Sequence, residues 1–122
     1  DPDVSRRQYV DNIISNDLTL SPKGDGNYSM RFYEVLSLGR VPVLIDTDME
    51  LPCEQEVDYK KSILRIPYQD IGQVSNIIFR WYSKLSAESF KDAQVGARQI
   101  FTNYLMADVF WKREVQRLIS NI

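Results

Sequence analysis

The chain has 122 residues, of which 43% are hydrophobic and 26% are charged, as in a single folded globular domain. Its formal net charge of −2, with no basic stripe, argues against a nucleic-acid-binding protein. No apolar run is long enough to cross a bilayer, and the absence of histidine excludes Ser-His-Asp and Cys-His catalysis within the chain. Because the first residue is Asp1 rather than Met, we expect a piece of a longer protein.

The first half of the sequence predicts a helix followed by a βαβ unit. Its expected elements are a helix over residues 3–16, a strand over 18–21, a loop over 22–27, a helix from 28 or 29 to 38 and a strand over 40–45. Gly39 lies where a left-handed residue commonly ends a helix. The last strand is continuously apolar, as in a parallel strand that is buried on both faces.

The second half predicts one more strand and three helices. The strand covers residues 62–66, Asp70 caps a helix with Gln73 as its capping-box partner, and Ser86 caps the next helix. The final helix begins near Asp108 and carries Trp111 and other apolar residues at helical spacing, which favours a core role for them. The fold class is therefore α/β, with a small parallel sheet flanked by helices and a helical C-terminal tail.

The loop between the first strand and its helix is a candidate anion-binding site. Ligands of parallel sheets bind at the carboxyl ends of the strands, and the first amides of a helix favour an anion. We expect Gly24 and Gly26 to adopt positive φ and to let the backbone approach a ligand, with Lys23 supplying charge. The loop is neither a Walker loop nor Gly-x-Gly-x-x-Gly, and an ordinary turn is the alternative.

Arg31 and Glu34 lie three positions apart on the helix that follows, so they share a face. One interpretation is a surface salt bridge that contributes little to stability. The other is that Arg31 holds a phosphate while Glu34 accepts hydrogen bonds from a ribose diol. The residues alone leave both interpretations open.

Several ordered motifs resemble the exostosin family, the family 47 glycosyltransferases. They are Ser21-Pro22-Lys23-Gly24, the stretch from Arg31-Phe32-Tyr33-Glu34 through Gly39-Arg40-Val41-Pro42-Val43, and Leu51-Pro52. The resemblance covers about residues 17–75. The C-terminal tail resembles the family only in being helical. The resemblance implies a Rossmann-like half of a GT-B enzyme, namely the C-terminal half that binds a nucleotide-sugar donor.

The resemblance also implies an activity. The chain, residues 1–122, would be a single donor-binding domain of an inverting glycosyltransferase of polysaccharide biosynthesis that moves a sugar to a glycan or another hydroxyl acceptor. Its acceptor domain would lie N-terminal and outside this chain, so the chain alone would be inactive. The implied donor site comprises Lys23, Gly24, Gly26, Asn27, Ser29, Arg31 and Glu34. No catalytic base is assigned, and neither a cofactor nor a divalent metal is expected.

Three other signals are weaker. Asp46-Thr47-Asp48 could hold a divalent metal, contact the donor sugar, or simply end a strand. Asn27-Tyr28-Ser29 matches the N-glycosylation sequon but is interpreted as a chance occurrence inside the donor loop. Cys53 has no cationic neighbour in the sequence, which favours a structural thiol.

Two further function classes remain beside the glycosyltransferase. The first is a non-catalytic module that binds a nucleotide or a sugar phosphate, which the same loop chemistry would serve. The second is a helix-rich interaction domain without a ligand, which the shared face of Arg31 and Glu34 beside the glycine loop disfavours.

Overall fold

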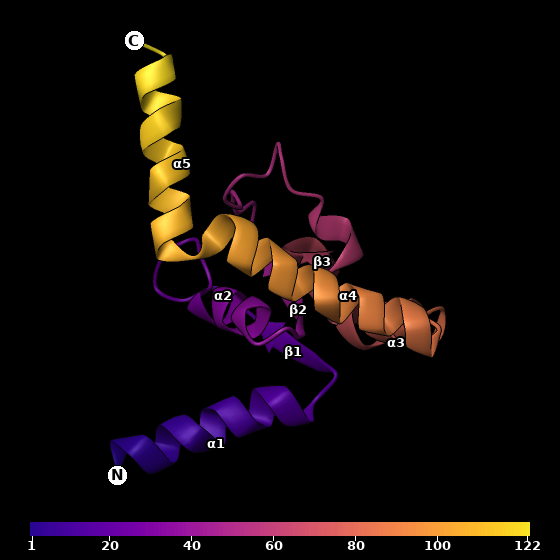
Figure 1. The fold of residues 1–122 in the computed structure, drawn as a ribbon. Helices are drawn as coiled ribbons and strands as arrows, with labels where there is room; N and C mark the ends of the chain where they lie inside the picture. Colours follow the sequence, from indigo (N-terminus) through magenta and orange to yellow (C-terminus); the bar gives the residue numbers. More distant parts are fainter.

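The computed structural model describes residues 1–122 and contains a three-stranded parallel sheet in the order β1-β2-β3. The strands are β1 (Leu18–Ser21), β2 (Val41–Asp46) and β3 (Leu64–Pro67). Leu18 is opposite Val41, and Val43 is opposite Leu64. The predicted α/β class, with a small parallel sheet and a helical C-terminal region, is confirmed (Figure 1).

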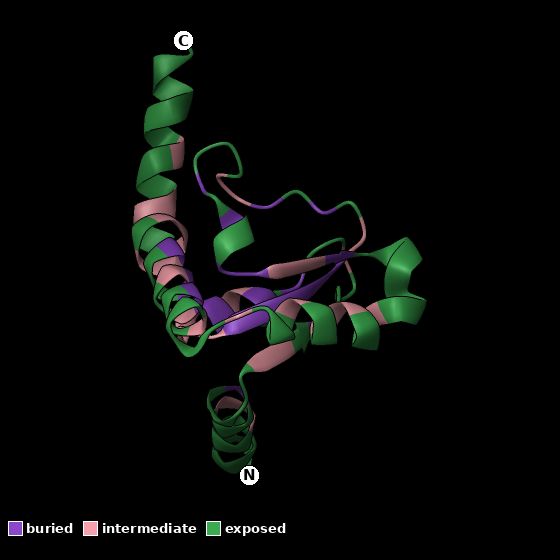
Figure 2. Cartoon of the chain, turned by 90° about the vertical axis from the view of Figure 1, so that its right-hand side faces the viewer, coloured by how far each residue is buried: buried purple, intermediate pink, exposed green.

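Helices cover both faces of the sheet. Leu44 of the central strand points to one face, where it packs with residues of α2 (Met30–Ser37) and α4 (Ala87–Ile100). Its neighbours Val43 and Ile45 point to the other face, toward α3 (Val74–Ser83). Alternate residues of a strand point to opposite faces, so a strand covered on both sides is apolar throughout. Figure 2 shows this buried centre in purple, inside exposed outer helix surfaces.

Local signals fix both ends of α2. The Ser29 hydroxyl accepts a hydrogen bond from Phe32 N at 3.3 Å and so caps the first turn. Gly39 follows the helix with φ of +65°, which confirms the predicted left-handed conformation. The helix therefore starts directly after the loop and returns the chain into β2.

Two predicted boundaries are wrong. The third strand begins at Leu64 instead of residue 62, because Tyr59–Lys61 forms a 3₁₀ turn. The Tyr59 carbonyl accepts from both Ser62 N and Ile63 N, which holds these two residues outside the strand. Asp70 does not cap a helix, because it lies inside a 3₁₀ segment, Tyr68–Gln73, that starts directly after the strand. The α-helix begins only at Val74 and has no side-chain cap. Ser86, in contrast, caps α4 as predicted, with Ser89 completing a capping box.

The two terminal helices, α1 (Pro2–Ser15) and α5 (Ala107–Ser120), lie on the outside of the fold (Figure 1). A π-helical turn, Phe101–Leu105, separates α4 from α5, which extends away from the sheet. The prediction that the apolar residues of α5 are core is wrong, since Trp111 is 64% exposed and Leu118 is 58% exposed. None of the helices combines the length and the apolar character that a membrane crossing requires.

Candidate functional site

The predicted donor loop borders a cavity of about 460 Å³ at the carboxyl end of β1. The cavity walls include these predicted site residues: Lys23, Gly24, Ser29, Arg31 and Glu34. They come from the loop after β1 and from the first turns of α2, as expected for a parallel sheet. Gly26 and Asn27, the other two predicted residues, belong to the same loop but do not line the cavity.

The two loop glycines have roles that differ from the prediction. Neither adopts positive φ, which among the glycines occurs only at Gly39. Gly24 N donates to Tyr28 O at 2.9 Å, and this bond closes the loop. A Cβ at Gly24 would meet nothing closer than 3.9 Å, whereas one at Gly26 would lie 2.5 Å from the Tyr28 ring. A side chain at Gly26 would therefore displace the exposed Tyr28 ring, while Gly24 leaves its side of the loop open.

Arg31 and Glu34 do not form a salt bridge. Instead Tyr9, from α1, lies between them. Its hydroxyl donates to Glu34 Oε2 and accepts from Arg31 Nε at 3.3 Å. The Arg31 guanidinium also lies 5.5 Å from the centre of the Tyr9 ring, within the range of a cation–π contact. The sequence does not predict this role of Tyr9, because its apolar spacing on a helix gives no signal of a polar contact 25 positions away.

The environment of Tyr9 favours its neutral phenol. Burial raises the pKa of Tyr9, the hydrogen bond to Glu34 raises it further, and Arg31 opposes both effects. A neutral phenol keeps its proton and can donate to the carboxylate. The three side chains thus form one connected polar group on the wall of the cavity.

Asn27 turns away from the cavity toward the end of β2. Its side chain donates to Asp48 O at 3.4 Å and accepts from the Thr47 hydroxyl. Ser29, the third residue of the sequon, is buried as the cap of α2. The side chains of Asn27 and Ser29 therefore both have structural partners.

Asp46 of the Asp46-Thr47-Asp48 motif is held by Arg65. Arg65 Nε lies 2.8 Å from Asp46 Oδ2, while the other carboxylate oxygen of Asp46 accepts from Met49 N at 3.0 Å. Arg65 also pairs with Glu54 and donates to Met49 O at 2.7 Å. These bonds tie the connection after β2 to β3, which is the strand-end role among the three alternatives.

Cys53 lies half-buried in that connection. Burial raises the pKa of its thiol, and nearby Glu56 and Glu114 raise it further, while Arg113 opposes them. A raised pKa keeps the sulfur as a thiol, which is a poor nucleophile. The structural interpretation of Cys53 agrees with this environment.

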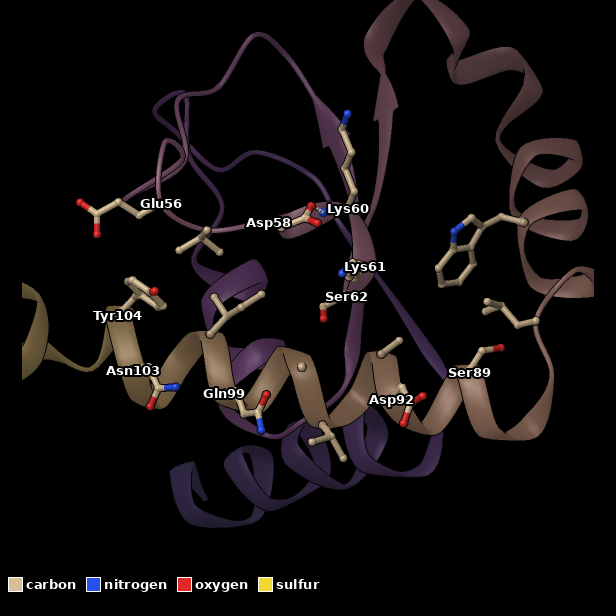
Figure 3. A pocket seen from close by; sticks show the side chains of 17 residues that line it. Glu56, Asp58, Lys60, Lys61, Ser62, Ser89, Asp92, Gln99, Asn103 and Tyr104 are labelled. Atoms are coloured by element: carbon tan, nitrogen blue, oxygen red, sulfur yellow. Dashed lines mark hydrogen bonds between the residues drawn. The ribbon is translucent and has the colours of Figure 1, made fainter.

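A larger cavity, of about 720 Å³, lies elsewhere, between α4 and the turn that precedes β3 (Figure 3). It contains none of the predicted site residues. Its walls carry both signs of charge, with Lys60 and Lys61 on the turn and Asp92 on α4. This cavity lies at the turn that precedes β3, whereas the loop cavity lies at the carboxyl end of β1, where parallel sheets bind ligands.

Comparisons with known proteins agree with the motifs. The family model described as the RXYLT1 C-terminal domain matches residues 1–72. The Exostosin-1 homolog of Caenorhabditis elegans is 24% identical over 117 residues, which is 96% of this chain and 30% of the relative. Exostosin-1 of Drosophila melanogaster is 25% identical over 111 residues, which is 91% of this chain and 13% of the relative.

The chain therefore spans less than a third of the length of these relatives. Similarity extends over nearly the whole chain, and the family model includes the loop, α2 and β2 that surround the cavity. The exostosin resemblance is confirmed, and the domain is related to those glycosyltransferases. The chain belongs to the RXYLT1 C-terminal domain family.

Proposed function

We propose that this domain is the donor-binding half of an exostosin-like, inverting glycosyltransferase with a GT-B architecture, and that the loop cavity holds the nucleotide-sugar. The observation that carries the proposal is the joint position of Lys23, Arg31 and Glu34 around one cavity at the carboxyl end of β1. This is the edge where parallel sheets bind ligands. The exostosin relatives support the same function.

Each polar group of the cavity suits one part of a nucleoside diphosphate sugar. Lys23 and Arg31 are exposed cations, which attract a diphosphate, and Arg31 has a planar fork that matches phosphate oxygens. The open side of Gly24 lets the backbone approach the ligand. Glu34 uses one carboxylate oxygen for Tyr9, and the other has no partner, so it can accept from a ribose hydroxyl.

In the proposed reaction an acceptor hydroxyl attacks the anomeric carbon as the bond to the nucleoside diphosphate breaks. Negative charge grows on the leaving phosphate, and Arg31, Lys23 and the first turn of α2 would stabilise it. The base that removes the proton of the acceptor, the acceptor site and the N-terminal domain that carries them would belong to the longer enzyme. We therefore expect the 122-residue chain to transfer no sugar by itself.

Donor binding in this proposal uses no divalent metal. The carboxylate best placed to serve as a ligand after β2, Asp46, is already engaged by Arg65 and by Met49 N. Removing metal with EDTA should accordingly leave the affinity for a nucleoside diphosphate unchanged.

The second candidate is a non-catalytic nucleotide or sugar-phosphate binding module. It is favoured by the absence of histidine, which leaves the chain without the most common general base. Both candidates predict nucleotide binding. Transfer of sugar by the longer protein, measured with a nucleotide-sugar and a glycan acceptor, separates them.

The test of the donor site is calorimetry of the chain with UDP and with GDP. A hydrogen bond from a ribose hydroxyl to a carboxylate contributes at most about 1.5–3 kcal/mol, so Glu34→Ala should lower the affinity roughly tenfold to a hundredfold. Glu34→Gln should fall between wild type and Glu34→Ala, because the amide keeps an acceptor but loses the charge. Arg31→Ala should also weaken binding, with a smaller effect at high salt.

Glu88→Ala is the matched control, because Glu88 is an exposed carboxylate in the first turn of α4 and does not line the loop cavity. It should bind UDP like the wild type, and circular dichroism should show both glutamate variants folded. The donor-site proposal fails if no heat is seen with UDP or GDP at millimolar concentration, or if folded Glu34→Ala binds as tightly as the wild type.

A further inference from the structure

We propose that Tyr9 is a positioning residue of the loop cavity, which holds Arg31 and Glu34 apart so that both keep groups free for a ligand. The inference rests on the proposed nucleotide-sugar site. It adds to that site a residue from α1 that the donor motif does not include.

The contacts of Tyr9 place it between two opposite charges. The hydroxyl accepts from Arg31 Nε at 3.3 Å and donates to Glu34 Oε2, while the ring lies beside the guanidinium. One hydroxyl can accept one hydrogen bond and donate another at the same time. Tyr9 therefore satisfies a donor of Arg31 and an acceptor of Glu34 together.

Without Tyr9 the two charges have an obvious alternative. Residues three apart on a helix are neighbours, and an arginine and a glutamate at this spacing form an ion pair. The structure contains no such pair, although Arg117 and Glu114 form one at the same spacing on α5, with 2.9 Å between Nη2 and Oε2. In that pair the glutamate precedes the arginine, whereas Arg31 precedes Glu34, and here the tyrosine hydroxyl bonds both side chains.

This arrangement leaves atoms of both Arg31 and Glu34 free to bind a nucleotide. Arg31 uses only Nε for Tyr9, so both terminal nitrogens have no hydrogen bond within the protein. Glu34 likewise has one free carboxylate oxygen. A direct Arg31–Glu34 pair would occupy those atoms and cancel the positive charge that attracts a diphosphate.

The first experiment needs no ligand. The chain is labelled with ¹³C at the tyrosine Cζ, the Tyr9 signal is assigned by its loss in Tyr9→Phe, and its pH titration is followed by NMR. Since the bond to Glu34 raises the pKa of Tyr9 and Arg31 lowers it, Glu34→Gln should shift the titration to lower pH and Arg31→Ala to higher pH. An unchanged titration in both variants would mean that the three groups are not coupled, and the proposal would be wrong.

The second experiment measures UDP affinity for Tyr9→Phe, which keeps the ring and removes only the hydroxyl. We expect about a three- to tenfold loss, smaller than that for Glu34→Ala because the phenol acts through its neighbours. The affinity of Tyr9→Phe should also depend less on salt, since the paired Arg31 no longer presents a free charge. A purely structural role for Tyr9 would not change the salt dependence.

Tyr33→Phe is the matched control, because Tyr33 lies on α2, is half-buried, and its hydroxyl has no hydrogen bond in the structure. It should bind UDP like the wild type at every salt concentration. If Tyr9→Phe also binds like the wild type while the titrations show coupling, the positioning role is refuted and the donor site stands. If the wild type binds neither UDP nor GDP, the donor site fails and the role of Tyr9 fails with it.

Discussion

Replacing Arg65 tests what holds the connection after β2 in place. Its side chain is 32% exposed, and its guanidinium bonds Asp46, Glu54 and the Met49 carbonyl. Asp46 is the more buried acidic partner, at 18% exposure against 42% for Glu54. A charge-assisted hydrogen bond contributes about 1.5–3 kcal/mol and an exposed ion pair about 0.2–1 kcal/mol. Because Arg65→Met lets the freed groups regain water, we expect a net loss of about 2 kcal/mol.

Urea unfolding followed by circular dichroism measures this loss. For a slope of about 2 kcal/mol/M, the unfolding midpoint of Arg65→Met should fall by about 1 M. Arg117→Met is the control, since Arg117 and Glu114 form a surface pair on α5, and its stability should change by less than about 0.5 kcal/mol. A midpoint for Arg65→Met that matches the control would refute the idea that this cluster holds the connection after β2.

The same variant has a predictable pH dependence. The hydrogen bond from Arg65 is the main cause that lowers the pKa of Glu54 below its ordinary value of 4.5. A carboxylate with a lowered folded-state pKa stabilises the fold above its unfolded pKa and loses that effect as the pH falls. The stability difference between wild type and Arg65→Met should therefore be full at neutral pH and should shrink below pH 4.5. A difference that grows on acidification would contradict the role of Glu54.

Two further variants test the core and the end of α2. Leu44→Ala removes a fully buried side chain from the central strand, and urea unfolding should show a loss of about 2–5 kcal/mol. Gly39→Ala places a side chain at φ +65°, where the nearest outside atom to a new Cβ is 3.5 Å away, so the cost is conformational rather than steric. It should amount to about 1–2 kcal/mol in the same assay, and a loss below about 0.5 kcal/mol would show that the chain relaxes out of the left-handed region.

Local sequence signals predicted the elements that depend on neighbouring residues. The apolar run before Asp46 gives a strand covered on both faces, and Gly39 and Ser86 mark a helix end and a helix start as predicted. Sequence patterns that span a single turn predicted helix starts less well. Asp70 and Gln73 have the spacing of a capping box, but both belong to a 3₁₀ segment. A single turn can close as 3₁₀ or α, and its surroundings decide which.

In the site, too, local patterns predicted some features, whereas contacts between distant segments determine others. The βαβ order and the strand-end rule predicted that Lys23, Arg31 and Glu34 surround one space, and the cavity contains all three. The partner that separates the last two, Tyr9, depends on how α1 lies against α2, and no pattern within α1 encodes that contact. Apolar spacing also predicted a core role for Trp111, but burial depends on a covering surface, and α5 extends away from the sheet.

The loose attachment of α1 has a consequence for the energetics of the cavity. α1 does not pack extensively against any other element, and only Ile13 among its residues is buried. A helix held by so few contacts forms a cooperative unit with a low opening free energy, so its amides should exchange with deuterium sooner than those of β2. Because Tyr9 belongs to this unit, the cavity wall that it forms exists only while α1 is docked. A ligand that needs Tyr9 in place would therefore favour the docked state and slow that exchange.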